Sequence, residues 1–300
     1  LRLARDLKGG QTVGDIVKHK EQNIEGKIIE SNSFYTNPHN LTGKCDFVMA
    51  NPPFNVDKIN AKNKFLADDD RLPFGAPLTG KGTISNGNYL WMQYFHSYLN
   101  ETGRAGFVMA SSATDAGNAE KLIRQKLIET GDVECIVAIS NNFFYTRSLP
   151  CHVWFFNKGK KKENKDKVLM IDARNTFNKV STTINDFTDE QLEGLTAIMN
   201  AFRESNPEAV SSSGVENNSW LNQYFPKGTY EDVEGLCKIA SLQEIADQDY
   251  SLTPGRYVGV KIDVDMDFDY KTRMTQIHAE LAQLNTEANI LMQQIQSVNL

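Results

Sequence analysis

Apolar and polar positions alternate along the chain with two different periods, which predict strands and helices in turn. Short continuous apolar runs are typical of buried strands, whereas apolar residues three or four positions apart are typical of amphipathic helices. The pattern predicts strands at 47–50, 105–110, 133–139, 152–157 and 168–172, and helices at 88–99, 118–130 and 188–202. Strands alternating with helices indicate an α/β fold with a mostly parallel sheet. No helix separates the strands at 133–139 and 152–157, which predicts an antiparallel strand at the sheet edge.

The strand at 47–50 runs directly into the tetrapeptide Asn51-Pro52-Pro53-Phe54. Proline has no backbone N–H to give to a sheet ladder, so two consecutive prolines end the strand abruptly. Asn51 and Phe54 are therefore expected at the carboxyl edge of the sheet, where open α/β sheets bind their ligands. A short strand at 27–30 is predicted upstream, and Asn32 lies in the turn after it.

The chemistry that fits this turn is methylation of an exocyclic amino group. The lone pair of such a nitrogen is conjugated with its ring, and the nitrogen becomes a better nucleophile when hydrogen-bond acceptors hold its two protons. The side-chain oxygen of Asn51 and the carbonyl of Pro52 are candidate acceptors, and Phe54 can stack on the face of the base. Such positioning needs no ionisable base and no covalent intermediate. The competing interpretation is that Asn-Pro-Pro is simply a turn.

Composition and charge limit the partners of this chain. Its 300 residues carry a net charge of −6. This charge argues against tight binding of nucleic acid by this chain alone, because such affinity comes mostly from Lys and Arg on phosphates.

Four cysteines without a CxxC pair predict reduced thiols in a cytoplasmic protein. The histidines show no metal-ligand spacing, so no metal site is predicted. The chain begins with Leu1 rather than Met, so we expect it to be a fragment.

A strongly basic run extends from Lys158 to Lys167 between two predicted strands. One interpretation is a contact with phosphate groups. The other is a solvated hairpin tip, which is the more common role of such charge runs.

The end of the chain carries the clearest periodic pattern. Apolar residues recur at alternating intervals of three and four, at Met274, Ile277, Leu281, Leu284, Ala288, Leu291, Ile295 and Val298. This spacing predicts a long coiled-coil-like helix within 261–300.

A single helix cannot bury this row of apolar residues by itself. Since no other predicted helix is as long, we expect a partner chain to cover it, and packing within this chain is the alternative.

Several motifs together resemble a known family. The tetrapeptide after the first strand resembles the catalytic motif of adenine-N6 DNA methyltransferases. A wider series resembles the modification (methyltransferase) subunit of type I restriction-modification systems: NYLWMQYF at 88–95, GRAGFVMA at 103–110, NFFYTRSLP at 142–150, VLMIDAR at 168–174, YEDVEGLCK at 230–238 and LTPGRYVG at 252–259. The likeness covers this chain nearly end to end, but only the carboxyl-terminal part of the family's length.

The resemblance implies a Rossmann-like sheet that depends on S-adenosylmethionine and transfers a methyl group to N6 of a flipped adenine. It implies that Asn51, Pro52, Pro53 and Phe54 are catalytic, that Phe54 with Phe144 and Tyr145 of the aromatic cluster 143–145 stacks on the target base, and that Asn32 and Asn51 contact the cofactor. It also implies three partners: double-stranded DNA, a restriction subunit, and a specificity subunit that binds the C-terminal helix. The expected domains are a partial catalytic domain at 1–174, a helical and irregular extension at 175–260 and the assembly helix at 261–300.

The chain departs from the family pattern at its amino end. The family's glycine-rich turn after the first sheet strand and its acidic residue after the second would lie upstream of Leu1. We therefore expect a sheet that is incomplete at the amino end and that binds S-adenosylmethionine poorly by itself. Two other functions remain open: a methyltransferase that acts on RNA or on protein amides, and an inactive scaffold subunit with the same fold.

Overall fold

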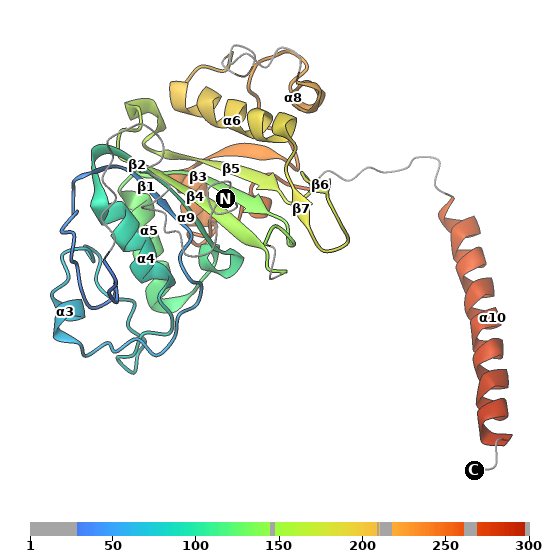
Figure 1. Cartoon of the computed structure of the whole chain (residues 1–300). Helices are drawn as coiled ribbons and strands as arrows, with labels where there is room; N and C mark the ends of the chain where they lie inside the picture. Colours follow the sequence, from blue (N-terminus) through green and yellow to red (C-terminus); the bar gives the residue numbers. More distant parts are fainter. Residues whose placement is uncertain (1–28, 145–147, 209, 211–217, 261–268, 298–300) are drawn as a thin grey trace, which may run out of the picture. The chain divides into compact units, whose positions relative to one another are not determined.

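The computed structural model describes residues 29–144, 148–208, 210, 218–260 and 269–297. The chain divides into two compact units, Leu1–Val260 and Lys261–Leu300. The larger unit contains a six-stranded sheet with helices on both faces, and the smaller unit contains one long helix (Figure 1).

The sheet has the strand order β1-β2-β4-β3-β5-β8. Its strands are β1 (Cys45–Ala50), β2 (Leu99–Ala110), β3 (Val133–Ile139), β4 (Cys151–Asn157), β5 (Lys167–Ala173) and β8 (Cys237–Ser241). β1, β2, β3 and β5 run parallel to one another, and β4 and β8 run antiparallel to them. The expected mostly parallel α/β sheet is thus confirmed. β8 was not predicted, and it extends this sheet from within the segment expected to form a separate extension.

The prediction that 152–157 forms an edge strand is wrong. β4 lies inside the sheet, where Trp154 stands opposite Phe107 of β2 and Ile136 of β3. Trp154 and Phe156 are both fully buried. Because β4 is apolar on both faces, an interior position removes more of its surface from water than an edge position does. A continuous apolar run without alternation was the signal that favoured the interior.

Helices of the larger unit cover both faces of the sheet. They are α3 (Lys64–Ala67), α4 (Asn88–Tyr98), α5 (Asn118–Glu129), α6 (Asp189–Glu204), α8 (Ser219–Tyr224) and α9 (Leu242–Asp247). α4 and α5 lie on one face, and α6 with α8 lies on the other (Figure 1). Successive residues of β3 serve the two cores in turn: Ile136 packs in the core with α4 and α5, and Cys135 and Val137 pack in the core with α6. The period of two along a strand produces this division.

Shorter elements connect the main ones: the two-stranded pair β6 (Asn178–Lys179) and β7 (Asn185–Asp186), and the 3₁₀ turns η1 (Ser111–Thr114), η2 (Lys162–Asn164) and η3 (Pro254–Arg256). The three predicted helices of the larger unit are confirmed, with their ends shifted by no more than two residues. Of the predicted strand at 27–30, Ile29 and Glu30 belong to no strand, and residues 27 and 28 lie outside the described residues.

The four cysteines are free thiols, as expected. Cys135, Cys151 and Cys237 are buried in the sheet. Burial raises the pKa of the Cys151 thiol to about 11 and that of the Cys237 thiol to about 12, because a thiolate is poorly solvated there. These thiols therefore act as small apolar core residues.

The segment between β1 and α4 folds onto α4 although its sequence shows no clear periodicity. Its apolar side chains form a third core with Phe34 and two residues of α4, from Ile59, Leu66, Leu72, Ile84, Leu90 and Tyr94. Arg71 is 1% exposed beside this core. Its Nη2 donates to Asp69 Oδ2 at 2.7 Å and to the carbonyl of Ser33 at 2.8 Å, and its guanidinium lies 4.0 Å from the ring centroid of Tyr94. Arg71 thereby ties the segment to the turn that carries Asn32.

The smaller unit is organised around α10 (Tyr270–Ser297). The predicted C-terminal helix is confirmed through Ile295, and Val298 lies outside the described residues. Among the described residues of this unit there is no second helix to pack on the apolar row. No helix in the described part of the chain is both long and apolar enough to cross a membrane.

Replacing Arg71 tests its role in holding the third core. We expect Arg71→Met to lower the free energy of unfolding by about 3 kcal/mol, because the Asp69 carboxylate is left buried without its partner. Urea denaturation followed by circular dichroism measures the change. The control is Lys64→Met, an exposed cation on α3, which should change the free energy by no more than about 0.5 kcal/mol. Equal stability of the two variants would contradict the role assigned to Arg71.

Candidate active site at the carboxyl edge of the sheet

The predicted catalytic turn begins where β1 ends. β1 runs parallel to β2 with Ala50 opposite Phe107, so Asn51 is the first residue beyond the carboxyl edge. Asn51 is exposed, Pro52 is buried and Phe54 is half-buried. Within the described residues, neither the side chain of Asn51 nor the carbonyl of Pro52 has a hydrogen-bond partner. The turn therefore presents two neighbouring oxygens that can accept hydrogen bonds from a ligand.

Two of the predicted stacking residues meet beside this turn. The rings of Phe54 and Phe144 lie edge to face, with centroids 6.1 Å apart and planes at 75°. Phe143 instead packs on Phe187 at 4.7 Å, and Tyr145 lies outside the described residues. In this edge-to-face contact the two rings support each other, so Phe144 helps to fix the orientation of Phe54.

Asn185 holds the loop that carries Phe144. Its backbone N–H donates to the carbonyl of Asn142 at 2.8 Å, and its side-chain amide donates to the carbonyl of Asn141 at 3.1 Å. Asn185 is buried. These two bonds fix the loop from β3 just before the aromatic pair and so set the height of Phe144 above the sheet edge.

Asn32 and Pro53 line one hollow of about 820 Å³. The side-chain oxygen of Asn32 accepts from the N–H of Phe34 at 3.0 Å and so closes its own turn. Phe34 and Trp91 form an aromatic wall of the hollow, with ring centroids 4.6 Å apart. The Trp91 indole N–H is buried and has no partner among the described residues. An indole donor, an amide and an aromatic wall suit a flat, polar ring such as a purine.

The chain after the turn is clamped to the start of α4. The N–H of Asn55 donates to Asn88 Oδ1 at 2.9 Å, and Asn88 Nδ2 donates to Asn55 Oδ1 at 2.8 Å. The N–H of Gly87 adds a bond to the carbonyl of Val56 at 2.9 Å. A side chain at position 87 would not fit, because its Cβ would lie 2.8 Å from Cζ of Phe34. Three hydrogen bonds thus fix the exit from the catalytic turn.

Comparison with known proteins now identifies the family. The N-6 DNA Methylase family matches residues 16–265. The chain belongs to this family. Its recognition from the sequence motifs, and the fold class that followed from it, are confirmed.

Curated relatives of this chain carry type I restriction names. It is 36% identical over 253 residues to the type I restriction enzyme MjaIX methylase subunit of Methanocaldococcus jannaschii, covering 84% of this chain and 41% of the relative. It is 33% identical over 248 residues to the HindI methylase subunit of Haemophilus influenzae, covering 82% of this chain and 49% of the relative. The chain thus spans less than half the length of these two proteins.

Solved structures share the fold. A type I restriction-modification methyltransferase subunit from Streptococcus thermophilus superposes with a TM-score of 0.62 at 23% identity, over 82% of this chain and 45% of that one. A chain from a structure of a type I restriction-modification system superposes with a TM-score of 0.52 at 16% identity, over 91% of this chain and 49% of that one. The fold is therefore that of type I methyltransferase subunits.

The sequence did not predict the clamp between Asn55 and Asn88. Asn88 opens one of the motifs that carried the resemblance, but its partner Asn55 lies 33 positions earlier, and nothing local joins the two. Trp91 belongs to the same motif, and its unpaired indole N–H becomes evident only from the packing around it. The available signal was Asn88 itself, a polar residue at the start of a helix whose next four residues are apolar or aromatic.

Removing the clamp should loosen the exit from the turn. We expect Asn88→Ala to speed amide exchange at Asn55 about tenfold, because the N–H of Asn55 loses its acceptor. Amide hydrogen exchange measured by NMR reports this rate. The matched control is Asn86→Ala, because Asn86 Oδ1 accepts from the N–H of Asn88, the first residue of α4, at 2.9 Å. That variant should lower helix stability by about 1 kcal/mol, the value of one hydrogen bond, without changing exchange at Asn55. Equal effects of the two variants at Asn55 would show that Asn88 acts only through the helix.

Proposed function

We propose that this protein is the adenine-N6 methyltransferase subunit of a type I restriction-modification complex and that Asn51, Pro52 and Phe54 form its base site. The observation that carries the proposal is the pair of unpartnered acceptors, Asn51 Oδ1 and the Pro52 carbonyl, beside the aromatic pair Phe54 and Phe144. An exocyclic amino group offers two N–H donors on one nitrogen. Two adjacent acceptors next to an aromatic face complement that group and little else.

The turn activates the nitrogen by holding its protons. When both N–H groups of adenine N6 donate to the turn, the nitrogen is drawn away from conjugation with the ring, and its lone pair becomes available. The acceptors carry no formal charge and cannot keep a proton, so the proton that N6 loses when its bond to the methyl group forms passes to water. Phe54 holds the base plane, and Pro53 holds the Pro52 carbonyl at a fixed angle because its ring restricts the preceding residue. The rate gain comes from orientation and from preorganised dipoles.

S-Adenosylmethionine supplies the methyl group when it is bound. The hollow shared by Asn32 and Pro53 fits its adenine: Phe34 and Trp91 give an aromatic wall, and the buried Trp91 N–H has an unused hydrogen bond to donate. β1 is the outermost strand described, and its Phe47 and Met49 are 74% and 90% exposed. We propose that other parts of the complete protein cover this side of β1 and finish the cofactor site.

Substituting Asn51 tests the base site. We expect Asn51→Ala to slow transfer of labelled methyl groups to adenine in duplex DNA by about 100-fold to 1000-fold in the assembled complex, by analogy with the loss of one preorganised hydrogen-bonding group from other active sites. The control is Asn222→Ala, an exposed asparagine on α8, which should leave the rate unchanged. A near-normal rate in the complex that carries Asn51→Ala would mean that another site catalyses the transfer and that this chain is an inactive scaffold. Transfer to RNA or protein amides in place of DNA would overturn the proposed substrate.

The partner proposal rests on α10. The helix has 28 residues and is about 42 Å long, and its apolar row includes Leu281, Leu284, Leu291 and Ile295, each more than half exposed. A row of this length with alternating spacing is what a second helix covers in a coiled coil. We propose that the specificity subunit supplies that helix and thereby brings the DNA-reading surface to this chain.

Charges placed in the row should block assembly. We expect the double variant Leu284→Lys and Leu291→Lys to lose association with the specificity subunit while the larger unit stays folded, because two ammonium groups cannot be buried in an apolar seam. Size-exclusion chromatography with light scattering measures association. The control carries the same charges on the opposite face of α10, as Thr286→Lys and Gln293→Lys, and should still associate. Association of the Leu variant would mean that another surface holds the partner.

A further inference from the structure

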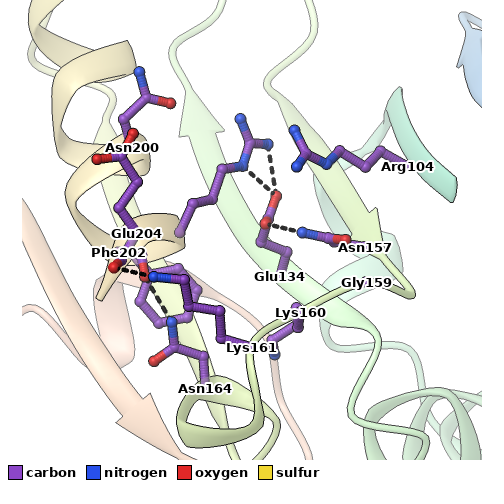
Figure 2. Close-up of a pocket in the computed structure, with 11 residues that line it drawn as sticks. Arg104, Glu134, Asn157, Gly159, Lys160, Lys161, Asn164, Asn200, Phe202 and Glu204 are labelled. Atoms are coloured by element: carbon purple, nitrogen blue, oxygen red, sulfur yellow. Dashed lines mark hydrogen bonds and ion pairs between the residues drawn. The ribbon is translucent and has the colours of Figure 1, made fainter. Parts of the chain in front are cut away.

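A second cavity lies at the amino edge of the sheet, opposite the catalytic turn. It has a volume of about 290 Å³, at the small end of the roughly 300–1,000 Å³ typical of ligand pockets. Arg104 near the start of the parallel part of β2, Glu134 at the start of β3 and Asn157 at the end of β4 line it (Figure 2). Since parallel strands end at the opposite edge, this cavity is separate from the site at Asn51.

Positive charge dominates the cavity. Its lining includes four cations and two carboxylates, from Arg104, Lys160, Lys161, Arg203, Glu134 and Glu204. The carboxylate of Glu134 is fully engaged, because Arg203 donates to its Oε2 at 2.9 and 2.6 Å and Asn157 donates to its Oε1 at 2.7 Å. Lys161 donates to the carbonyl of Glu204. Arg104 has no partner within the described residues and is exposed at the cavity mouth. On a chain of net charge −6, this is a local excess of cations.

One buried acceptor of the cavity lining, Asn157 Oδ1, receives no hydrogen bond from the described residues. The Asn157 side chain is buried, with 4% of the residue exposed. The orientation of its amide is fixed, because Glu134 can only accept and so must face the NH₂ group. Asn157 Oδ1 therefore points the other way, toward Gly159, and has no partner in the described structure. Buried acceptors are nearly always paired in folded proteins, so a group with an O–H or N–H completes the site.

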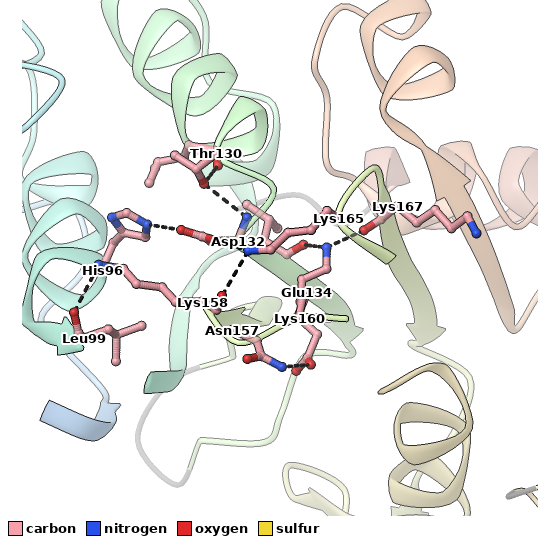
Figure 3. Close-up of polar contacts among 12 residues, drawn as sticks. His96, Leu99, Thr130, Asp132, Glu134, Asn157, Lys158, Lys160, Lys165 and Lys167 are labelled. Atoms are coloured by element: carbon pink, nitrogen blue, oxygen red, sulfur yellow. Dashed lines mark hydrogen bonds and ion pairs between the residues drawn. The ribbon is translucent and has the colours of Figure 1, made fainter. Parts of the chain in front are cut away.

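Internal ties make the rim of the cavity rigid. Lys160 Nζ donates to the carbonyls of Val133 at 2.8 Å and Lys167 at 2.6 Å (Figure 3). Lys165 Nζ donates to Asp132 Oδ1 at 2.9 Å. Burial lowers the pKa of Lys160 to about 8, and an anion beside it would raise that pKa again. Lys158, Lys160 and Lys165 of the basic run are therefore bonded within the protein, whereas Lys161 and Lys162 are exposed to solvent.

We propose that this cavity binds inorganic phosphate in its hydrogen phosphate form. Arg104 and the ammonium N–H groups of Lys160 and Lys161 that do not donate to carbonyls hold the charged oxygens, and the protonated oxygen donates to Asn157 Oδ1. The acceptor discriminates between oxyanions. Inorganic phosphate keeps a proton at neutral pH, whereas sulfate has none and a phosphodiester has none, so both would leave Asn157 unpaired and bring an oxygen lone pair against it. A guanidinium with several N–H groups suits a tetrahedral oxyanion.

Calorimetric titration of the full chain with phosphate and with sulfate, at pH 7 and constant ionic strength, tests the proposal. We expect saturable binding of phosphate that is about tenfold tighter than binding of sulfate, the value of one hydrogen bond to a charged group. Arg104→Gln should weaken phosphate binding about tenfold. The matched control is Lys126→Gln, which removes one exposed positive charge on α5 and should leave phosphate binding unchanged.

Three outcomes would overturn the proposal. Equal binding of phosphate and sulfate would mean that Asn157 does not read a proton. Equal loss of binding in Arg104→Gln and Lys126→Gln would mean that phosphate responds only to overall charge. Displacement of phosphate by a DNA duplex without terminal phosphates would assign the cavity to nucleic-acid backbone instead.

Discussion

The carboxyl end of β1 is where the backbone stops offering hydrogen-bond donors, because Pro52 and Pro53 have no N–H. The strand must end there, and the oxygens of Asn51 and Pro52 have no hydrogen-bond partner in the part of the chain that the structure describes. A turn without backbone donors cannot hold its own shape by pairing. Asn88, which lies outside the turn, fixes its shape instead. Its side chain accepts from the N–H of Asn55 and donates to the side chain of Asn55. The same missing donors thus create the open acceptors and require the clamp.

The two edges of the sheet have opposite electrostatic character. At the carboxyl edge, acceptors are in excess, and the ligand that fits brings donors. At the amino edge, donors are in excess, because the loop after β4 turns the ammonium groups of Lys158, Lys160 and Lys165 inward onto carbonyls and Asp132. Among the described side chains there, the buried acceptor without a donor is Asn157 Oδ1. One sheet therefore presents complementary binding chemistry at its two edges without sharing a residue between them.

The parts of the fold that depend on residues close together in the sequence could be predicted from the sequence. Apolar periodicity gave the strands and helices, and two prolines gave the turn. The interior position of β4, the addition of β8 and the bond between Asn55 and Asn88 could not be predicted in the same way, because each depends on a pairing between segments far apart in the sequence. The inward lysines escaped prediction for a related reason: a run of charge looks solvated until carbonyls without partners are found beside it. The site residues Asn51, Phe54 and Phe144 were proposed from local motifs, and the aromatic contact between the last two is a geometric fact that the motifs alone did not contain.

This chain has even less positive charge available to bind DNA than its net charge of −6 suggests. Arg71 is buried and bonded to Asp69 and the carbonyl of Ser33, and Arg124 is buried with its guanidinium on the carbonyls of Ala116 and Tyr250. Such cations cannot also neutralise phosphates, and non-specific affinity for a duplex follows the number of phosphates that are neutralised. Under the proposed function, we infer that the binding energy that brings a base out of a duplex comes from another chain. That division suits the chemistry of the turn, because uncharged acceptors need the amino group delivered accurately and do not attract it from a distance.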